Sequence, residues 1–371
     1  MSRTSTAANL RRLWLNVHLW IGVGLLVLLI PVGLSGSILV WHGAVDRALY
    51  SQRYEVSGPA SQPPSTYLGV AKAAFGDRAT PTSLRLPDKA GDPVTVVGRL
   101  AGPPAANGRP RQLTAWIDPA TARVLDTGEI NQSFTGVLHR LHGSLLISAP
   151  GLGRKIVGWL GWAMTVSCLT GLWLWWPRKG SPVKGLRWRR SSSTLTNLHH
   201  MFGFWILIPL LVVSLTGVYI SFPKTSHALF GAPPPASRPA GRAMPRPLKT
   251  PNLTADQVFA KAVQTSPGAA LSSMTLPTEG KKSVWKVELA QGPPVEVDDR
   301  TGQAVASRPE RPGGAGPDPL SRLMRKVHDG AETPLVWQIL VFLTGIAPAL
   351  LGVTGVVMWL RRKSRTDLLA S

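Results

Sequence analysis

Cysteine is almost absent from this 371-residue chain, which contains only Cys168. A single thiol excludes a disulfide framework, and it also excludes a zinc or iron–sulfur site built from the cysteines of one chain. Several enzyme motifs are missing as well: a Walker-type phosphate loop, G-x-S-x-G, H-E-x-x-H, and a dinucleotide fingerprint on a strand–helix unit. Any chemistry that the protein performs therefore depends on other residues.

Charged residues are absent from four long apolar stretches. Each stretch can hold the roughly 20 apolar residues that a membrane-spanning helix needs. They predict four transmembrane helices near 17–41, 154–176, 200–222 and 335–360. The first stretch is too long for a signal-peptide core and lacks a small-residue cleavage site, so we expect a retained anchor. Because these stretches contain no acid, they offer no buried acid pair to a proton-coupled carrier.

The formal net charge of +22 is unevenly distributed. Basic residues cluster at both termini and between the second and third predicted helices, where Asp367 is the only acid. The basic residues are Arg3, Arg11, Arg12, Arg178, Lys179, Lys184, Arg187, Arg189, Arg190, Arg361, Arg362, Lys363 and Arg365. By the positive-inside rule, both termini and the short middle loop are cytoplasmic and the two long loops are outside. The charge thus indicates topology, with anionic lipid headgroups rather than nucleic acid as its counter-charge.

The two long loops have the pattern of small α+β domains. The first has a Pro/Ser/Gln linker at 57–65, then a helix at 67–75 and strands at 83–86, 94–100, 113–117 and 123–125. The second has a Pro-rich linker at 233–251, then a helix from Thr254 to about 264 and strands at 271–276, 284–289, 295–297 and 304–306. Exported domains and a single cysteine together favour a bacterial inner membrane that faces a periplasm.

The chain contains an internal repeat. The hairpin sequence I-D-P-A-T-A-R-V-L of residues 117–125 returns as V-D-D-R-T-G-Q-A-V in residues 297–305. The predicted fold class is a mainly α membrane protein whose four transmembrane helices form two pseudo-repeats, each with an exported α+β domain. The predicted segments are 1–42 with the first helix, 43–140 exported, 141–177 with the second helix, 178–198 cytoplasmic, 199–222 with the third helix, 223–330 exported, and 331–371 with the fourth helix and the tail.

Four histidines occupy equivalent places in the two repeats. His18 and His199 enter the first and third apolar stretches with the same spacing to a preceding Asn and a following Gly, and His142 and His328 precede the second and fourth stretches. A histidine in a membrane is costly unless it has a partner. If the repeats pack about a pseudo-twofold axis, His18 meets the region of His199 and His142 meets His328. Paired imidazoles from facing helices can hold haem iron, so the pattern suggests two haems.

Small residues accompany these histidines along the predicted helices. They would let a flat macrocycle or a neighbouring helix approach closely. The residues are Gly22, Gly36, Gly171, Gly203, Gly217 and Gly355.

The residues alone leave several alternatives open. His200 adjoins His199, and neighbours on a helix point about 100° apart, so only one of the two can face the axis; the repeat register favours His199. His139 lies one turn before His142 and is either a substitute ligand or a gate beside the outer haem. His42 is a secondary outer candidate, and His227 is interpreted as a loop residue. The alternative for the whole set is that the histidines are ordinary headgroup-level residues.

Several longer motifs resemble those of the PepSY-associated transmembrane proteins, a family that includes iron-regulated membrane proteins and bacterial siderophore reductases. The resemblance covers nearly the whole chain. It rests on H-L-W-I-G at 18–22, L-H-G-S-L-L at 141–146, G-L-G-R-K-I-V-G at 151–158, L-T-G-L-W-L-W-W-P-R at 169–178, N-L-H-H-M-F-G at 197–203 and V-H-D-G at 327–330. The two exported α+β segments look like PepSY domains.

The resemblance implies an inner-membrane protein with b-type haem that passes electrons outward to a ferric siderophore or another iron chelate. It implies that His18 with His199 or His200 holds the inner haem iron, and that His142 with His328 holds the outer one. The electron donor is either a quinol or a soluble cytoplasmic reductase. Two other functions compete with this one: a non-enzymatic PepSY membrane protein that binds a peptide or protein partner, and an accessory subunit of iron uptake.

Overall fold

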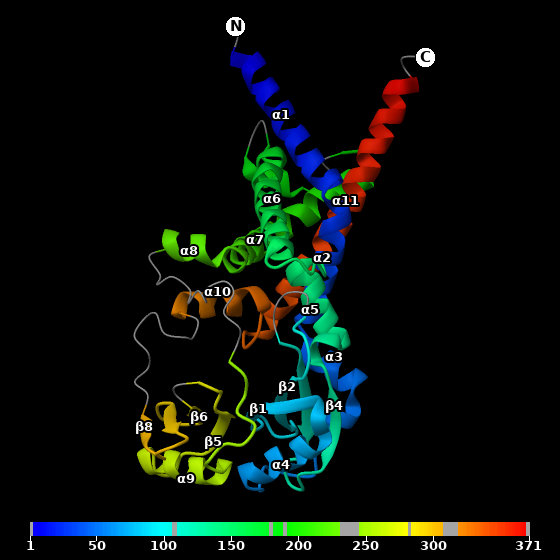
Figure 1. Cartoon of the computed structure of the whole chain (residues 1–371). Helices are drawn as coiled ribbons and strands as arrows, with labels where there is room; N and C mark the ends of the chain where they lie inside the picture. The colour runs from blue at the N-terminus through cyan, green and yellow to red at the C-terminus, as the bar shows by residue number, and fades with distance from the viewer. Residues whose placement is uncertain are drawn as a thin grey trace. The chain divides into compact units, whose positions relative to one another are not determined.

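The computed structural model describes residues 3–105, 110–177, 181–187, 191–230, 245–280, 283–306 and 318–368. They belong to two compact units: a helical unit of Met1–His42, Leu138–Ala232 and Pro317–Ser371, and a sheet unit of Gly43–Val137 and Pro233–Gly316 (Figure 1). Arg178, Lys179, Arg189 and Arg190 of the predicted basic loop, and residues 233–244 of the second linker, lie outside the described residues.

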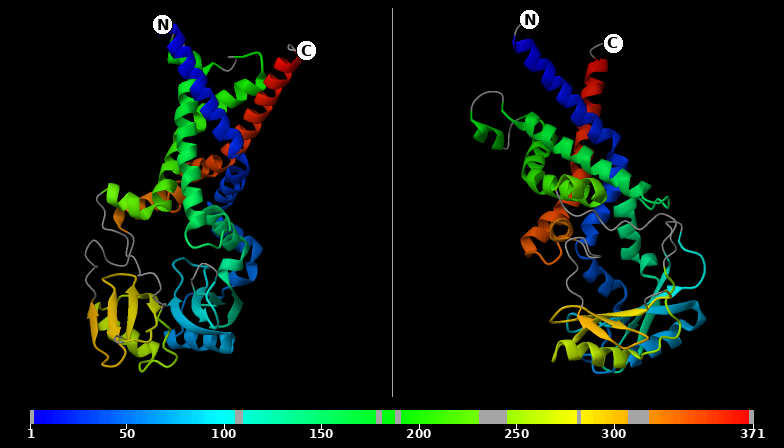
Figure 2. Two further views of the ribbon diagram at one scale, coloured as in Figure 1. Left: turned by 45° about the horizontal axis from the view of Figure 1, so that its top comes forward. Right: turned by 60° about the vertical axis from the view of Figure 1, so that its left-hand side comes forward.

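Three helices in the described part of the helical unit are long and apolar enough to cross a membrane. They are α6 (Leu152–Trp175), α7 (Thr194–Ser221) and α11 (Leu335–Leu368), the last of which qualifies over Leu335–Arg362. α6 packs against α7, and α7 packs against α11 (Figures 1 and 2). The beginning of α1 and the end of α11 lie at the same end of this unit in all views.

The first predicted spanning helix is instead two helices, α1 (Arg3–Gly24) and α2 (Leu26–Leu39), bent by 67°. The break follows Gly24, which has no side chain to support the helix, and Pro31 in α2 has no amide hydrogen to donate to the preceding turn. α2 packs along α11 and α1 packs against α6. The bent pair makes a fourth span if α1 and α2 are counted together.

Shorter helices complete the helical unit. α5 (Phe134–Ser144) precedes α6, α8 (Pro223–Leu229) follows α7, and α10 (Pro319–Asp329) precedes α11. A fourth short helix, α3 (His42–Leu49), leads into the sheet unit. α10 contacts α7, and its N-terminus is capped by Asp318, which accepts a hydrogen bond from the Ser321 amide. The packing of α10 on α7 places His328, near the end of α10, next to Val213 of α7.

The sheet unit merges the two predicted α+β segments into one antiparallel sheet. Its strand order is β4-β3-β2-β1-β5-β6-β7-β8. The strands are β1 (Ala79–Arg85), β2 (Val94–Leu100), β3 (Gln112–Ile117), β4 (Val124–Gly128), β5 (Leu271–Thr275), β6 (Val284–Leu289), β7 (Val295–Asp298) and β8 (Ala304–Ala306). The halves join where β1 pairs with β5, with Leu84 opposite Met274. Each half therefore protects one edge strand of the other.

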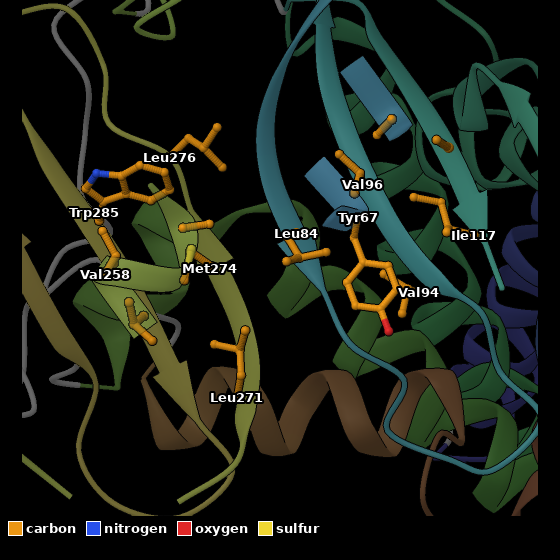
Figure 3. Packing of buried hydrophobic residues seen from close by; sticks show 14 of the residues in the cluster. Tyr67, Leu84, Val94, Val96, Ile117, Val258, Leu271, Met274, Leu276 and Trp285 are labelled. Carbon is orange, nitrogen blue, oxygen red and sulfur yellow. The ribbon is translucent and has the colours of Figure 1, made fainter. Parts of the chain in front are cut away.

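One helix from each half packs on the sheet. These are α4 (Pro64–Phe75) and α9 (Ala255–Thr265), and α9 begins with a capping box between Thr254 and Gln257. Both helices supply fully buried side chains to a shared core, Tyr67 and Phe75 from α4 and Val258 from α9 (Figure 3). β2, β6 and β7 contribute alternate residues to the same core, as expected for a sheet with one covered face, whereas β3 is buried at five successive positions.

Buried carboxylates fasten each linker to its half of the sheet. Asp118 is 1% exposed and accepts hydrogen bonds from the Ser57 amide at 2.8 Å and from the Thr121 hydroxyl. Asp299 is fully buried and accepts hydrogen bonds from the Asn252 amide at 3.0 Å and from Trp285 Nε1 at 2.8 Å. Burial alone would raise the pKa of Asp118, but the hydrogen bonds from Ser57 and Thr121 outweigh it and lower the pKa to about 2.

The Asp118→Ala substitution is expected to lower the free energy of unfolding of the sheet unit by about 2 kcal/mol, because buried donors lose a charged acceptor. Because the folded-state pKa is depressed, the stabilisation is present above the unfolded-state value of 3.8 and is lost as the pH falls through about 2. Thermal unfolding of the full chain in detergent, followed by circular dichroism, measures both effects. The exposed Asp77→Ala variant is the control, and an equal loss of stability at low pH in the Asp118→Ala and wild-type proteins would contradict the assignment.

Candidate functional site

His18, near the end of α1, and His199, near the start of α7, form a pair. Their ring centroids are 6.4 Å apart and their planes are nearly perpendicular. His18 Nδ1 lies 3.1 Å from the Ser167 carbonyl oxygen of α6. His199 Nδ1 lies 2.8 Å from Thr354 Oγ1 of α11, a hydroxyl that itself donates to a carbonyl of its own helix. Both Nδ1 atoms therefore face acceptors supplied by neighbouring helices.

His142 of α5 and His328 of α10 form a second pair. Their ring centroids are 5.9 Å apart, with 46° between the planes. His142 Nδ1 lies 2.8 Å from the Val32 carbonyl oxygen of α2. His328 Nδ1 lies 3.0 Å from the Val213 carbonyl oxygen of α7. The second pair thus repeats the arrangement of the first with a different set of helices.

These partners determine which ring nitrogen carries the hydrogen in each histidine. Three of the partners are carbonyl oxygens, which cannot donate, and the Thr354 hydroxyl beside His199 already donates to a carbonyl of its own helix. In all four histidines Nδ1 is therefore the donor and Nε2 keeps its lone pair. Metal-binding imidazoles in proteins are usually oriented in this way, with the second nitrogen bonded to a carbonyl or another acceptor. A metal ion bound by two Nε2 atoms at about 2 Å holds the ring centroids about 6 Å apart. Both pairs have the spacing and the tautomer of a shared metal ligand set.

Each of the four rings packs against a glycine of a neighbouring helix. A Cβ atom on Gly36 would lie 2.7 Å from His142 Cε1, and one on Gly217 would lie 3.0 Å from His328 Cε1. The corresponding distances are 3.2 Å from Gly171 to His18 and 3.7 Å from Gly355 to His199. Four of the six glycines predicted to accompany the histidines therefore make room for imidazole rings, most tightly in the second pair.

The remaining two glycines face a cavity beside the first pair. A Cβ on Gly22 would meet nothing within 4 Å, and one on Gly203 would touch only Leu351 at 3.8 Å. The cavity has a volume of about 510 Å³ and is lined by His18, His199, His200 and both glycines, with Arg11 and Arg362 also in its wall. This volume is within the range of about 300–1,000 Å³ typical of cofactor sites. A flat apolar group with acidic substituents, such as haem, fits these residues.

The other predicted candidates lie around the two pairs. His200 is in the cavity wall with its ring 6.5 Å from that of His199. His139 faces His42, with ring centroids 5.8 Å apart. The structure thus brings His18 to His199 and His142 to His328, and it joins the two remaining outer histidines to each other. His42, the secondary outer candidate, thus lies next to His139.

The interpretation of His227 as a loop residue is wrong. His227 belongs to α8 and is 7% exposed. Its Nε2 lies 3.0 Å from Ser321 Oγ and 3.3 Å from Asp318 Oδ2, at the N-terminal cap of α10. No pattern around His227 in the sequence indicates this contact, because Ser321 lies 94 positions further along the chain. His227 therefore ties α8 to the helix that carries His328.

One comparison with known proteins found a match over nearly the whole chain. A family model described as the PepSY-associated TM region matches residues 15–362. A search of curated proteins found no match to the chain.

Proposed function

Because the chain belongs to the PepSY-associated transmembrane family, we propose that this membrane protein is a b-haem reductase that passes electrons outward to a ferric chelate. In this proposal the membrane is the bacterial inner membrane, both termini are cytoplasmic, and the two exported segments are periplasmic. The placement follows from the positive-inside rule applied to the basic termini and the middle loop.

The observation that carries the proposal is the duplicated histidine pair. Two pairs of rings, at 6.4 Å and 5.9 Å between centroids, stand at the separation needed for one metal ion each. Four unrelated headgroup-level histidines would not be expected to share a pair spacing, an Nδ1 partner on a neighbouring helix, and a glycine beneath the ring. We assign His18 and His199 to an inner haem, and His142 and His328 to an outer haem.

The chain's own residues would orient the ligands and control access of water. A bound haem supplies reversible one-electron exchange at its iron. The carbonyl oxygens of Ser167, Val32 and Val213 hold three rings with Nε2 directed away from the backbone and increase the basicity of that nitrogen. The apolar surroundings limit water at the ligands, and together with the ligands they set the reduction potential.

The proposed reaction is the transfer of one electron to a chelated ferric ion. The ferric ion becomes ferrous, and the chelate then holds it less strongly. The electron would come from a quinol or a cytoplasmic reductase. His18 and His199 would hold the haem nearer the donor, and His142 and His328 would hold the haem nearer the chelate. Exposed cations beside the outer pair, Arg140 on α5 and Arg322 and Arg325 on α10, would attract an anionic chelate. No residue needs to act as a general acid or base.

Absorption spectroscopy of the full-length protein from haem-replete cells tests the assignment. The dithionite-reduced wild type is expected to show b-type haem bands, and the double variant His18→Ala, His142→Ala is expected to lose them. Mixing the reduced wild type with ferric siderophores or ferric citrate should then reoxidise the haem and produce ferrous iron, detected with a ferrous-specific dye.

Two outcomes would favour other functions. A well-folded but colourless wild type would rule out the reductase and favour a PepSY protein that binds a peptide or protein partner. Haem that no ferric chelate reoxidises would contradict the reductase activity and leave an electron carrier for another acceptor. The exposed Asp77→Ala variant serves as the control in both measurements.

A further inference from the structure

A third pair of histidines lies beside the outer pair. His42 is the first residue of α3, and His139 lies on α5 one helical turn before His142. Their ring centroids are 5.8 Å apart, which is nearly the separation of His142 and His328, and their planes make an angle of 77°. Both residues of the third pair are exposed. Two imidazoles at this distance can converge on one metal ion.

The surroundings of the third pair favour a cation. His42 Nδ1 lies 3.0 Å from the Leu39 carbonyl oxygen, so its Nε2 keeps the lone pair, as in the other two pairs. Asp329, the last residue of α10, follows His328 and places a carboxylate next to the outer pair. A carboxylate on this part of the surface favours a bound divalent ion.

The third pair is not suited to a haem. Among the described glycines, none has the ring of His42 or His139 among its nearest neighbours, whereas all four rings of the other pairs rest on a glycine. The described part of the chain also contains no group of three His, Cys, Asp or Glu residues arranged to enclose a metal ion. An ion held by two imidazoles on an exposed surface keeps open coordination positions, so it exchanges readily.

We propose that His42 and His139 form a binding site for a divalent first-row transition-metal ion, and that the ion in the working protein is the ferrous product. Imidazole is a suitable ligand for iron, nickel, copper and zinc. A chelate that is selective for ferric iron binds ferrous iron less strongly, so the ferrous product can pass to such a ligand. The identity of the ion rests on the proposed reductase function, but the existence of the site does not. The site would receive the ion next to the outer haem and release it to solvent.

Calorimetric titration of the full-length protein with Co²⁺ tests the site, using a purification tag without histidine. Wild type is expected to bind about one Co²⁺ per chain at this pair, and His42→Ala and His139→Ala are each expected to weaken binding by about 10-fold or more. His42→Asn and His139→Asn repeat the test with polar replacements. The exposed Asp77→Ala variant is the control and should bind as wild type does.

Haem spectra of the same samples separate this inference from the proposed function. Saturable Co²⁺ binding that depends on both histidines supports the site, even if the wild type proves to contain no haem. Equal Co²⁺ affinity in wild type and in all histidine variants that elute as folded protein overturns it. The absence of saturable binding to a wild type that contains haem overturns the site alone and leaves the reductase proposal standing.

Discussion

On the proposed function, His199→Ala is expected to remove the inner haem, whereas His200→Ala is expected to leave both haems in place. The structure puts the His199 ring 6.4 Å from that of His18 and holds its Nδ1 on Thr354. The His200 ring is instead 6.5 Å from that of His199. Adjacent helical residues point about 100° apart, so the two cannot serve the same iron from one backbone position.

The haem-to-protein ratio of the purified variants, measured as a pyridine haemochrome, tests this difference. The ratio should fall from about two to about one in His199→Ala and stay near two in His200→Ala. Added imidazole should restore the inner haem to His199→Ala, because the deleted ring leaves space for it. The reverse pattern, with loss only in His200→Ala, would show that the wrong neighbour has been assigned.

Gly36→Ala is expected to displace the outer haem ligand without harming the helix. The new Cβ would lie 2.7 Å from His142 Cε1, closer than such atoms can approach, so the ring must shift. Alanine in a helix interior is otherwise more favourable than glycine by about 0.5–1 kcal/mol. A loss of haem would therefore come from the ligand rather than from helix propensity.

The matched control for Gly36→Ala is Gly143→Ala on α5, next to His142, whose new Cβ would meet nothing within 4 Å. Gly36→Ala is expected to weaken binding of the outer haem by about 10–100-fold, and Gly143→Ala is expected to leave both haems bound. Haem retention during dilution measures the binding of the haems, and a redox titration measures their reduction potentials. Two haems with unchanged potentials in Gly36→Ala would contradict the close packing of His142 on α2.

Much of the candidate site could be predicted from sequence because its signals are local or repeated. Uncharged stretches predict membrane helices, since each charge in lipid is costly. The repeated spacing of Asn, His and Gly around His18 and His199 favoured the residue that the structure places nearest to His18. The strands of the sheet unit were also recognisable, because alternating burial leaves an alternating apolar pattern.

Other features depended on contacts between distant parts of the chain. The pairing of β1 with β5 joins residues that are about 190 positions apart, and the sequence of neither strand indicates which strand it pairs with. The same applies to His227, whose burial depends on the cap of α10 and not on its own neighbours. The bend after Gly24 was missed because uncharged composition continues through it.

The sequence by itself determined the apolar segments, the α+β character of the sheet unit and the residues worth testing, because hydrophobicity and repeat spacing are properties of the chain alone. Only the tertiary structure decided which rings meet, which backbone carbonyl holds each Nδ1, and which glycine lies under each ring. It also brought His42 to His139. The physical reason is that these contacts depend on how separate helices pack, and helix packing is set by side chains from several segments acting together.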